Sequence, residues 1–236
     1  MTVSVQSVID RVQATLQDTT GIRWPVNDEL VLWVNDAQRE IALLKPDASA
    51  TNETITLTSG TKQSIPSGGN RLLRVVRNMS AASAGTGKRS IRLVSREILD
   101  SQTPDWHDPS VTGDAAHTSV VKHYMYDEQD PRNFYVYPGV SGNAYIEIVY
   151  SVNPATVTSS DNLSIPDIYA NSVMNYVLYM AYMKDAEYAG NNQRAANHYQ
   201  LFTASVTGKA QVDLITTPNA ESRSNPNLAA SAMVAQ

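Results

Sequence analysis

Hydrophobic and polar positions near the N-terminus alternate with the period of a helix. One face of segment 3–17 is apolar, at spacings of three and four residues: Val5, Val8, Ile9, Val12 and Leu16. A second segment, 28–43, shows the same period and follows Asn27, a favourable helix N-cap. Its predicted buried face consists of Leu30, Trp33, Val34, Ala37, Ile41 and Leu44. The chain is therefore predicted to begin with a pair of helices.

From about residue 52 the period changes to two, which is typical of strands. Ile55 and Leu57 alternate with threonines, and Ser59 and Gly60 form a turn from which the next strand can return as a hairpin partner. Further strands are predicted at 62–65, 71–77, 91–94, 117–126, 133–137 and 144–152. The connections between the last three are rich in turn-forming residues, so neighbouring strands are expected to be antiparallel.

The helical period returns in segments 167–189 and 191–207. The first is apolar on several sides, so it must be covered on more than one face, by its own domain or by a neighbouring chain. It also carries tyrosines along its length: Tyr169, Tyr176, Tyr179 and Tyr182. Such residues are more often core or interface than a platform for sugars or bases, because tyrosine buries a ring and keeps one polar group. We predict that these four tyrosines form a subunit interface.

The order of elements predicts an α+β fold in which the two helix pairs form a four-helix bundle and the strands form an inserted antiparallel β section. The expected domains are the N-terminal helix pair at 1–50, the β insertion at 51–160 and the C-terminal helix pair at 161–215. Segment 216–236 has too little apolar content to fold alone. It is either a frayed end or a flexible arm that orders on binding a partner.

Composition narrows the classes of function. The chain has 236 residues, 42% of them hydrophobic, which is enough for a substantial core. Its net charge of -5 argues against a protein that grips nucleic acid over a basic face, although a mildly acidic wall would let DNA slide past. There is no cysteine, which excludes disulfides and thiolate metal sites. No signal peptide or membrane-spanning run is evident.

Candidate chemistry is sparse. Segment 82–90, ASAGTGKRS, lacks the first glycine of a phosphate loop and the Ser or Thr after its lysine, so a hairpin loop is the better interpretation. A metal site could be drawn from Asp105, His107, Asp108, His117 and His123. However, six residues of strand separate the last two by about 20 Å. Trp106 is instead expected to anchor a long loop. We predict no catalytic residue, no cofactor and no metal, and therefore not an enzyme.

The order of several segments resembles a known family. These are DELVLWVNDAQREIALLKPDA at 28–48, GTKQSIPSGGNRLLRVVRN at 60–78, PDWH at 104–107, YDEQDPRNFYVYPGV at 126–140, IEIVYSVNPATV at 146–157 and IPDIYANSVMNYVLYMAYMKDAEYAGNNQRAANHY at 165–199. Together they resemble the head–tail adaptor, or connector, proteins of tailed double-stranded DNA bacteriophages, and are similar to tail tubular protein A. The resemblance covers roughly residues 20–208 and rests on order and diffuse pattern.

The resemblance implies a ring of adaptors, usually twelve, beneath the portal protein. A helical bundle would surround the channel for double-stranded DNA, and the β section would face outward or toward the tail tube or nozzle protein. The C-terminal arm would dock into the portal, with Asn225, Pro226, Asn227, Leu228, Met233 and Val234 as its binding residues. The implied location is the head–tail junction of the virion, and assembly is expected in the host cytoplasm. No membrane is expected as a partner.

A second hypothesis belongs to a different class. Exposed aromatic loops would make the chain a tail accessory protein that binds a carbohydrate or a host receptor. The lack of catalytic residues and the many-sided apolar helix are more typical of a building block in an assembly, so the structural adaptor is the leading interpretation.

Overall fold

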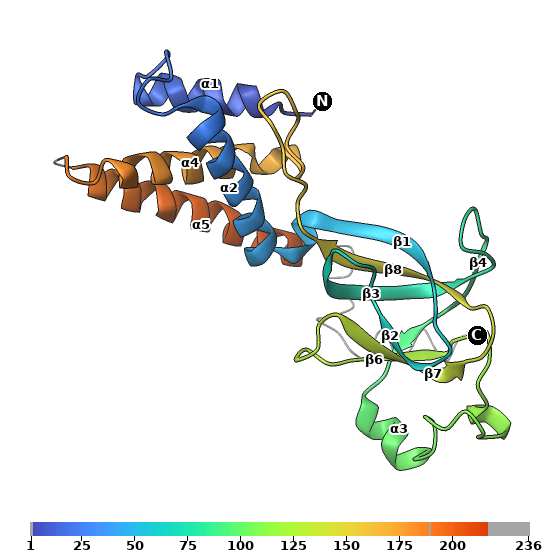
Figure 1. Ribbon diagram of the computed structural model, residues 1–236. Coiled ribbons are helices and arrows are strands. Elements are labelled where there is room, and N and C mark those ends of the chain that lie inside the picture. The colour runs from blue at the N-terminus through green and yellow to red at the C-terminus, as the bar shows by residue number, and fades with distance from the viewer. Residues whose placement is uncertain (1, 189, 217–236) are drawn as a thin grey trace. The chain divides into compact units, whose positions relative to one another are not determined.

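The computed structural model describes residues 2–188 and 190–216, and these form two compact units (Figure 1). The helical unit comprises the described residues of Met1–Lys45 and of Ala155–Gln236. The β unit is Pro46–Pro154, inserted between the two parts of the helical unit. The fold is therefore α+β, with the strands and long helices in separate units.

Four long helices make up the helical unit: α1 (Val5–Leu16), α2 (Val31–Leu44), α4 (Ala170–Lys184) and α5 (Asn191–Thr216). The Oγ of Ser4 caps α1 by accepting from the backbone N–H of Ser7 at 3.2 Å. A π-helical turn, η1 (Val26–Leu30), leads directly into α2. The predicted N-cap at Asn27 is therefore wrong, because this residue already lies inside the helical turn. A 3₁₀ turn, η4 (Asp167–Tyr169), leads into α4 in the same way.

The predicted four-helix bundle is wrong. Figure 1 shows α4 and α5 side by side with α2 running across them. The central helix α4 packs closely against α5 and also contacts α2 and α1, whereas α1 and α2 touch each other only slightly. The other three helices therefore pack around α4 instead of sharing one core with it as equal neighbours.

The burial pattern of α5 gives the physical reason for this arrangement. In a four-helix bundle each helix packs against two neighbours, which requires a broad apolar stripe. Among the described side chains of α5, the buried ones are Ala195, Phe202 and Val206, which form one narrow line. Such a line covers one helix, and in this fold it covers α4. The helix also extends to Thr216, well beyond the predicted end at residue 207.

The β unit contains two four-stranded sheets. One has the order β1 (Ala50–Thr56), β8 (Tyr145–Val152), β3 (Gly69–Met79) and β4 (Gly87–Ser90). The other has the order β2 (Gly60–Ser64), β7 (Asn133–Val140), β6 (His123–Tyr126) and β5 (Arg92–Leu93). One shared apolar cluster draws its buried residues from strands of both sheets, including Val75, Phe134, Val136, Ile146 and Ile148.

Strand pairing differs from the prediction in two respects. The two-residue strand β5 pairs parallel to β6, so the β section is not wholly antiparallel. The expected hairpin through Ser59 and Gly60 does not form, because β1 pairs with β8 and β2 pairs with β7. Gly60, with a φ of 104°, allows the sharp change of direction where the chain leaves one sheet for the other.

Three short helices complete the β unit: η2 (Pro46–Ser49), α3 (Arg96–Gln102) and η3 (Gly113–Ala115). Trp106 is fully buried beside Leu99 and Met125, and its Nε1–H donates to Asp100 Oδ1 at 2.8 Å. The prediction that Trp106 anchors the long loop is confirmed. Figure 1 shows α3 and this loop on the side of the unit occupied by the β6–β7 sheet.

The contact between α4 and α5 generates a prediction. Phe202 is fully buried, and its ring lies 5.1 Å from that of Tyr176. We expect Phe202→Ala to lower the free energy of unfolding by about 3–5 kcal/mol, because the cavity adds to the lost transfer free energy. Urea unfolding measures the change.

The neighbouring residue provides a matched control. Leu201 lies on the same helix but is 54% exposed, so Leu201→Ala is expected to change stability by about 0.5 kcal/mol or less. Equal losses for the two variants would contradict the assignment of Phe202 to the α4–α5 contact.

Candidate assembly interface

The tyrosines of α4 pack mainly against α5 of the same chain. Tyr176 contacts Phe202, and the ring of Tyr179 lies 5.0 Å from that of Tyr199. Tyr182 stacks on His198 with ring centroids 5.6 Å apart. Helix α5 of the same chain therefore buries part of the apolar surface that α4 was predicted to need covered.

Tyr169 is set apart from the other three tyrosines. It ends η4 and is 3% exposed, so it belongs to the core of the helical unit. The other three are half-buried and keep an open edge beside Tyr199, which is 40% exposed. A subunit interface at the tyrosines remains a prediction, and Tyr176, Tyr179 and Tyr182 are the ones with surface left for it.

Acidic residues of α2 lie near the tyrosines. Burial raises the pKa of Tyr176, and the negative charges of Glu40 and Asp36 raise it further. The phenol therefore stays neutral well above pH 7, and a partner at this edge would meet tyrosine hydroxyls beside carboxylates.

Further exposed apolar side chains of the helical unit escaped the sequence analysis. Leu32 and Leu43 lie eleven residues apart on α2, which places them on one face, and they are 54% and 73% exposed. On α5, Val212 and Ile215 are 52% and 75% exposed. The sequence pattern could have identified Leu32 and Leu43 as exposed apolar residues, because both fall outside the predicted buried face of their helix. Large exposed side chains on two helices are typical of a surface that a partner covers.

Two buried polar residues of α2 hold the segment that returns from the β unit. Asn35 donates from Nδ2 to the carbonyl of Val157 at 3.0 Å and accepts the N–H of Val157 at 2.8 Å. The Oε1 of Gln38 accepts from the backbone N–H of Ser164 at 2.7 Å. Both side chains are at most 4% exposed, so these bonds give partners to polar groups of α2 that lie inside the unit. The helical period of the sequence does not mark either residue, because it identifies apolar positions.

A partly buried ion pair fixes the end of α5. Lys45, at the end of α2, lies 2.7 Å from Asp213, and its side chain is 7% exposed. Lys209, one turn earlier on α5, also bonds Asp213. Hydrogen bonds from Lys209 and then Lys45 hold the pKa of Asp213 below its ordinary value of 3.8. The last described turns of α5 are thus tied to α2, just before the residues of the predicted arm.

The predicted portal-binding residues Asn225, Pro226, Asn227, Leu228, Met233 and Val234 lie outside the described residues. The segment 82–90, which resembled a phosphate loop, lies in the predicted hairpin: residues 82–86 belong to the β3–β4 connection and residues 87–90 form β4. Within the described residues, no three His, Cys, Asp or Glu side chains gather as a metal site requires. His107 instead bonds the hydroxyl of Thr61 at 2.7 Å, and burial lowers the pKa of His107.

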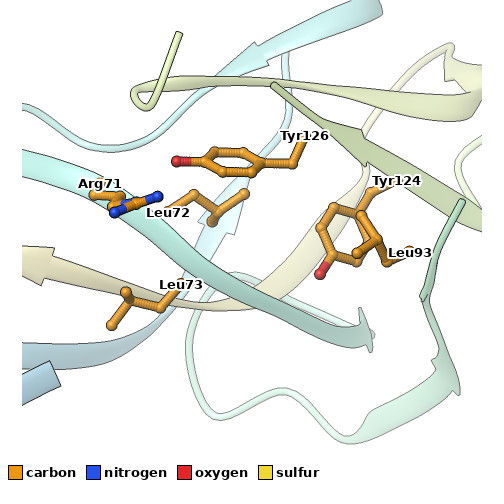
Figure 2. Close-up of a pocket in the computed structure, with 6 residues that line it drawn as sticks. All are labelled: Arg71, Leu72, Leu73, Leu93, Tyr124 and Tyr126. Carbon is orange, nitrogen blue, oxygen red and sulfur yellow. The ribbon is translucent and has the colours of Figure 1, made fainter. Parts of the chain in front are cut away.

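The β unit has a small hollow between its sheets. It measures about 260 Å³ and is lined by Arg71, Leu72 and Leu73 of β3, Leu93 of β5, and Tyr124 and Tyr126 of β6 (Figure 2). Its walls contain no carboxylate, histidine or cysteine, so the hollow suits an apolar side chain better than a reacting group.

The sequence model of the SU10 adaptor protein family matches residues 3–225, which include both units. The chain belongs to this family. The family consists of phage head–tail adaptors, so the adaptor is a virion component of a bacteriophage. No curated protein matches the adaptor. The similarity to tail tubular protein A remains a resemblance in sequence pattern.

Membership favours a structural role for the adaptor over an enzymatic one. None of the helices in residues 2–188 and 190–216 combines the length and the hydropathy that a bilayer span needs.

The ion pair at the end of α5 makes stability depend on pH. Because the pKa of Asp213 is lower in the folded adaptor than in the unfolded chain, its stabilising effect is present above the ordinary value of 3.8 and is lost as the pH falls. We expect Asp213→Asn to unfold more easily than the natural chain at pH 7, and the difference to shrink at pH 3. Thermal unfolding at a series of pH values measures both.

Glu128, an exposed residue in the turn between β6 and β7, provides the control. Glu128→Gln should leave the stability at pH 7 unchanged. A constant difference between the Asp213 variant and the natural chain from pH 7 to pH 3 would contradict a role for the carboxylate charge.

Proposed function

We propose that the chain is a structural head–tail adaptor that forms a ring between the portal protein and the tail. The observation that carries the proposal is the family match over residues 3–225, because it includes both units and not one of them alone. The exposed apolar side chains of α2 and α5 support it, since a ring gives each copy neighbours that cover such surfaces.

The proposed ring has twelve copies around the channel for double-stranded DNA. The net charge of -5 supports non-specific passage of DNA through the ring, because a negatively charged wall offers the DNA phosphates few attractive sites. The β unit would meet the tail tube or nozzle protein. The location is the head–tail junction, after assembly in the host cytoplasm.

The alternative of a carbohydrate- or receptor-binding accessory protein has weaker support. It requires exposed aromatic loops, but the loop residues Trp24 and Trp106 are 6% and 0% exposed, and buried rings offer no flat surface on which a sugar can stack. The loop residue Tyr188 is 61% exposed, but the guanidinium of Arg23 already lies over its ring at 5.0 Å from the centroid. The structural adaptor is therefore the function that the arrangement supports best.

The position and copy number in the virion test the proposal. We expect a reconstruction of the particle at the head–tail junction to place twelve copies of the chain in one ring beneath the portal. At physiological salt the free protein is expected to be monomeric if the portal is needed to complete the helical surface. A trimeric spike built from this chain would overturn the adaptor proposal.

The arm gives a second prediction. Residues 216–236 contain apolar anchors at Leu228, Met233 and Val234 in an otherwise polar segment. A segment of this kind can order against a groove at the moment of binding. We expect deletion of 216–236 to leave the melting temperature nearly unchanged but to prevent docking to isolated portal, measured by co-sedimentation.

A full-length variant separates the effect of the apolar anchors on docking from the effect of the arm's length. Changing Leu228, Met233 and Val234 together to Ser keeps the segment and removes its apolar groups, so docking should weaken as it does in the deletion. If the truncated adaptor docks with unchanged stoichiometry and affinity, the arm is not the contact and the helical unit must supply it.

A further inference from the structure

The β unit carries a group of basic side chains that we call the basic corner: Arg74, Lys88, Arg89, Arg92 and Lys122. Four of them are exposed and Lys122 is half-buried. Within the described residues none of the five has a carboxylate partner at ion-pair distance, whereas the nearby Arg77 is paired with Glu147 at 2.6 Å. The adaptor is acidic overall, so a cluster of unpaired cations stands out from the rest of its surface.

A buried side chain brings the strands of the basic corner together. Asn78 is 2% exposed, and its Nδ2 donates to the carbonyls of Arg89 at 2.9 Å and Val121 at 2.8 Å. The backbone N–H of Arg92 donates to the carbonyl of Lys122 at 3.3 Å. Lys122 therefore lies close to Arg89 and Arg92, although it is far from both in sequence.

Electrostatic effects agree with this convergence. Burial lowers the pKa of His123, and the positive charges of Arg89, Arg92 and Lys122 lower it further. Arg74 acts on the adjacent Tyr124, whose pKa is raised mainly by burial. Arg74, Arg89, Arg92 and Lys122 thus lie near one short stretch of β6.

The small hollow of the β unit lies at the same strands. Figure 2 shows Tyr124 and Leu93 on one side of it, and Arg71 and Leu72 near Tyr126 on the other. Leu93 directly follows Arg92 and is 62% exposed. Tyrosine and arginine around an apolar hollow are residue types enriched in protein interfaces. This surface suits an acidic partner that presents a protruding apolar side chain.

The helical unit of the same chain presents such a surface. The segments 18–29 and 184–188 contain five acidic residues and two cations, and we call them the acidic tip. Contacts across the two segments hold the tip together: Lys184 lies 2.6 Å from Glu29, and Arg23 lies 2.8 Å from Asp185.

Three carboxylates of the acidic tip have no cation at ion-pair distance within the described residues: Asp18, Asp28 and Glu187. Two large apolar side chains project beside them, Ile22 with 83% and Tyr188 with 61% of its surface exposed. Unneutralised negative charge around exposed apolar groups is the complement of the basic corner and its hollow.

We infer that the basic corner of one copy binds the acidic tip of a second copy. The contact joins two different faces of the chain, so it is heterologous, and repetition of such a contact around a closed rotation gives a ring. The inference rests on the proposed function and deepens it by naming the surfaces through which copies meet. The apolar hollow and the exposed Leu93 favour a protein partner over DNA, because phosphate recognition uses neither.

Cross-linking tests the contact, because the chain has no natural cysteine. Ser90 is exposed next to Arg89, and Asn27 is exposed next to Asp28. Ser90→Cys and Asn27→Cys proteins are mixed in equal amounts with a short bismaleimide at low salt. We expect the mixed dimer to exceed both like-with-like dimers and to disappear at high salt, because screening weakens charge pairs.

Charge reversal makes the test specific. R89E/R92E in the Ser90→Cys protein, or D28K/E187K in the Asn27→Cys protein, should each lower the yield of mixed dimer about tenfold, and combining the two reversed proteins should restore it to within about threefold. Arg132→Glu, an exposed charge outside the basic corner, should change nothing. Circular dichroism checks folding, and R89Q/R92Q replaces the reversal if R89E/R92E does not fold.

Several outcomes would overturn the inference: no excess of mixed dimer, a yield independent of salt, or no restoration by the combined reversals. Binding of a 30-base-pair duplex that requires Arg89 and Arg92, without any mixed dimer, would assign the basic corner to nucleic acid instead. A particle reconstruction with a ring whose copies meet elsewhere would reject this contact and leave the proposed function intact.

Discussion

The helix α4 is apolar around most of its circumference, and the helical unit is arranged to cover it. Its buried residues include Val173, Val177, Leu178 and Ala181, while its half-buried tyrosines face α5. Because removing apolar surface from water is the main favourable term in folding, three other helices pack around this one. The same demand explains why the four helices do not form equal pairs: each is placed by its contact with α4.

Polar groups fix the chain where apolar contact leaves its position open. Asn35 and Gln38 hold the returning segment to α2, and Lys45 holds the end of α5 through Asp213. The side chains of Asn35, Gln38 and Lys45 are buried, so loss of a partner leaves a costly unpaired group. In the β unit, Asn78 performs the same task between β4 and the start of β6. These contacts give the adaptor defined surfaces.

The sequence alone predicted the tyrosine surface and the family, but it did not predict the two charged surfaces of the proposed contact between copies. The tyrosines of α4, the loop anchor Trp106 and the family resemblance followed from residue type and order. The basic corner did not, because its cations come from β3, β4, β5 and the approach to β6, and a linear charge count shows an acidic chain. The acidic tip was missed for the same reason, since its two segments are more than 150 residues apart.

Two expectations failed locally: Leu44, placed on the buried face of its helix, is 41% exposed, and the strand predicted at 117–126 begins only at His123. The sequence by itself nevertheless determined where most helices and strands lie and which side of each faces an interior. It did so because the periods of 3.6 and 2 place apolar side chains on one side of an element. Only the tertiary structure decided which element supplies the other side. The choice of β8 over β2 as partner of β1, and of a central α4 over a four-helix bundle, depends on the joint burial of distant residues. Periodicity indicates that a face of an element must be covered, but it does not identify the element that covers it.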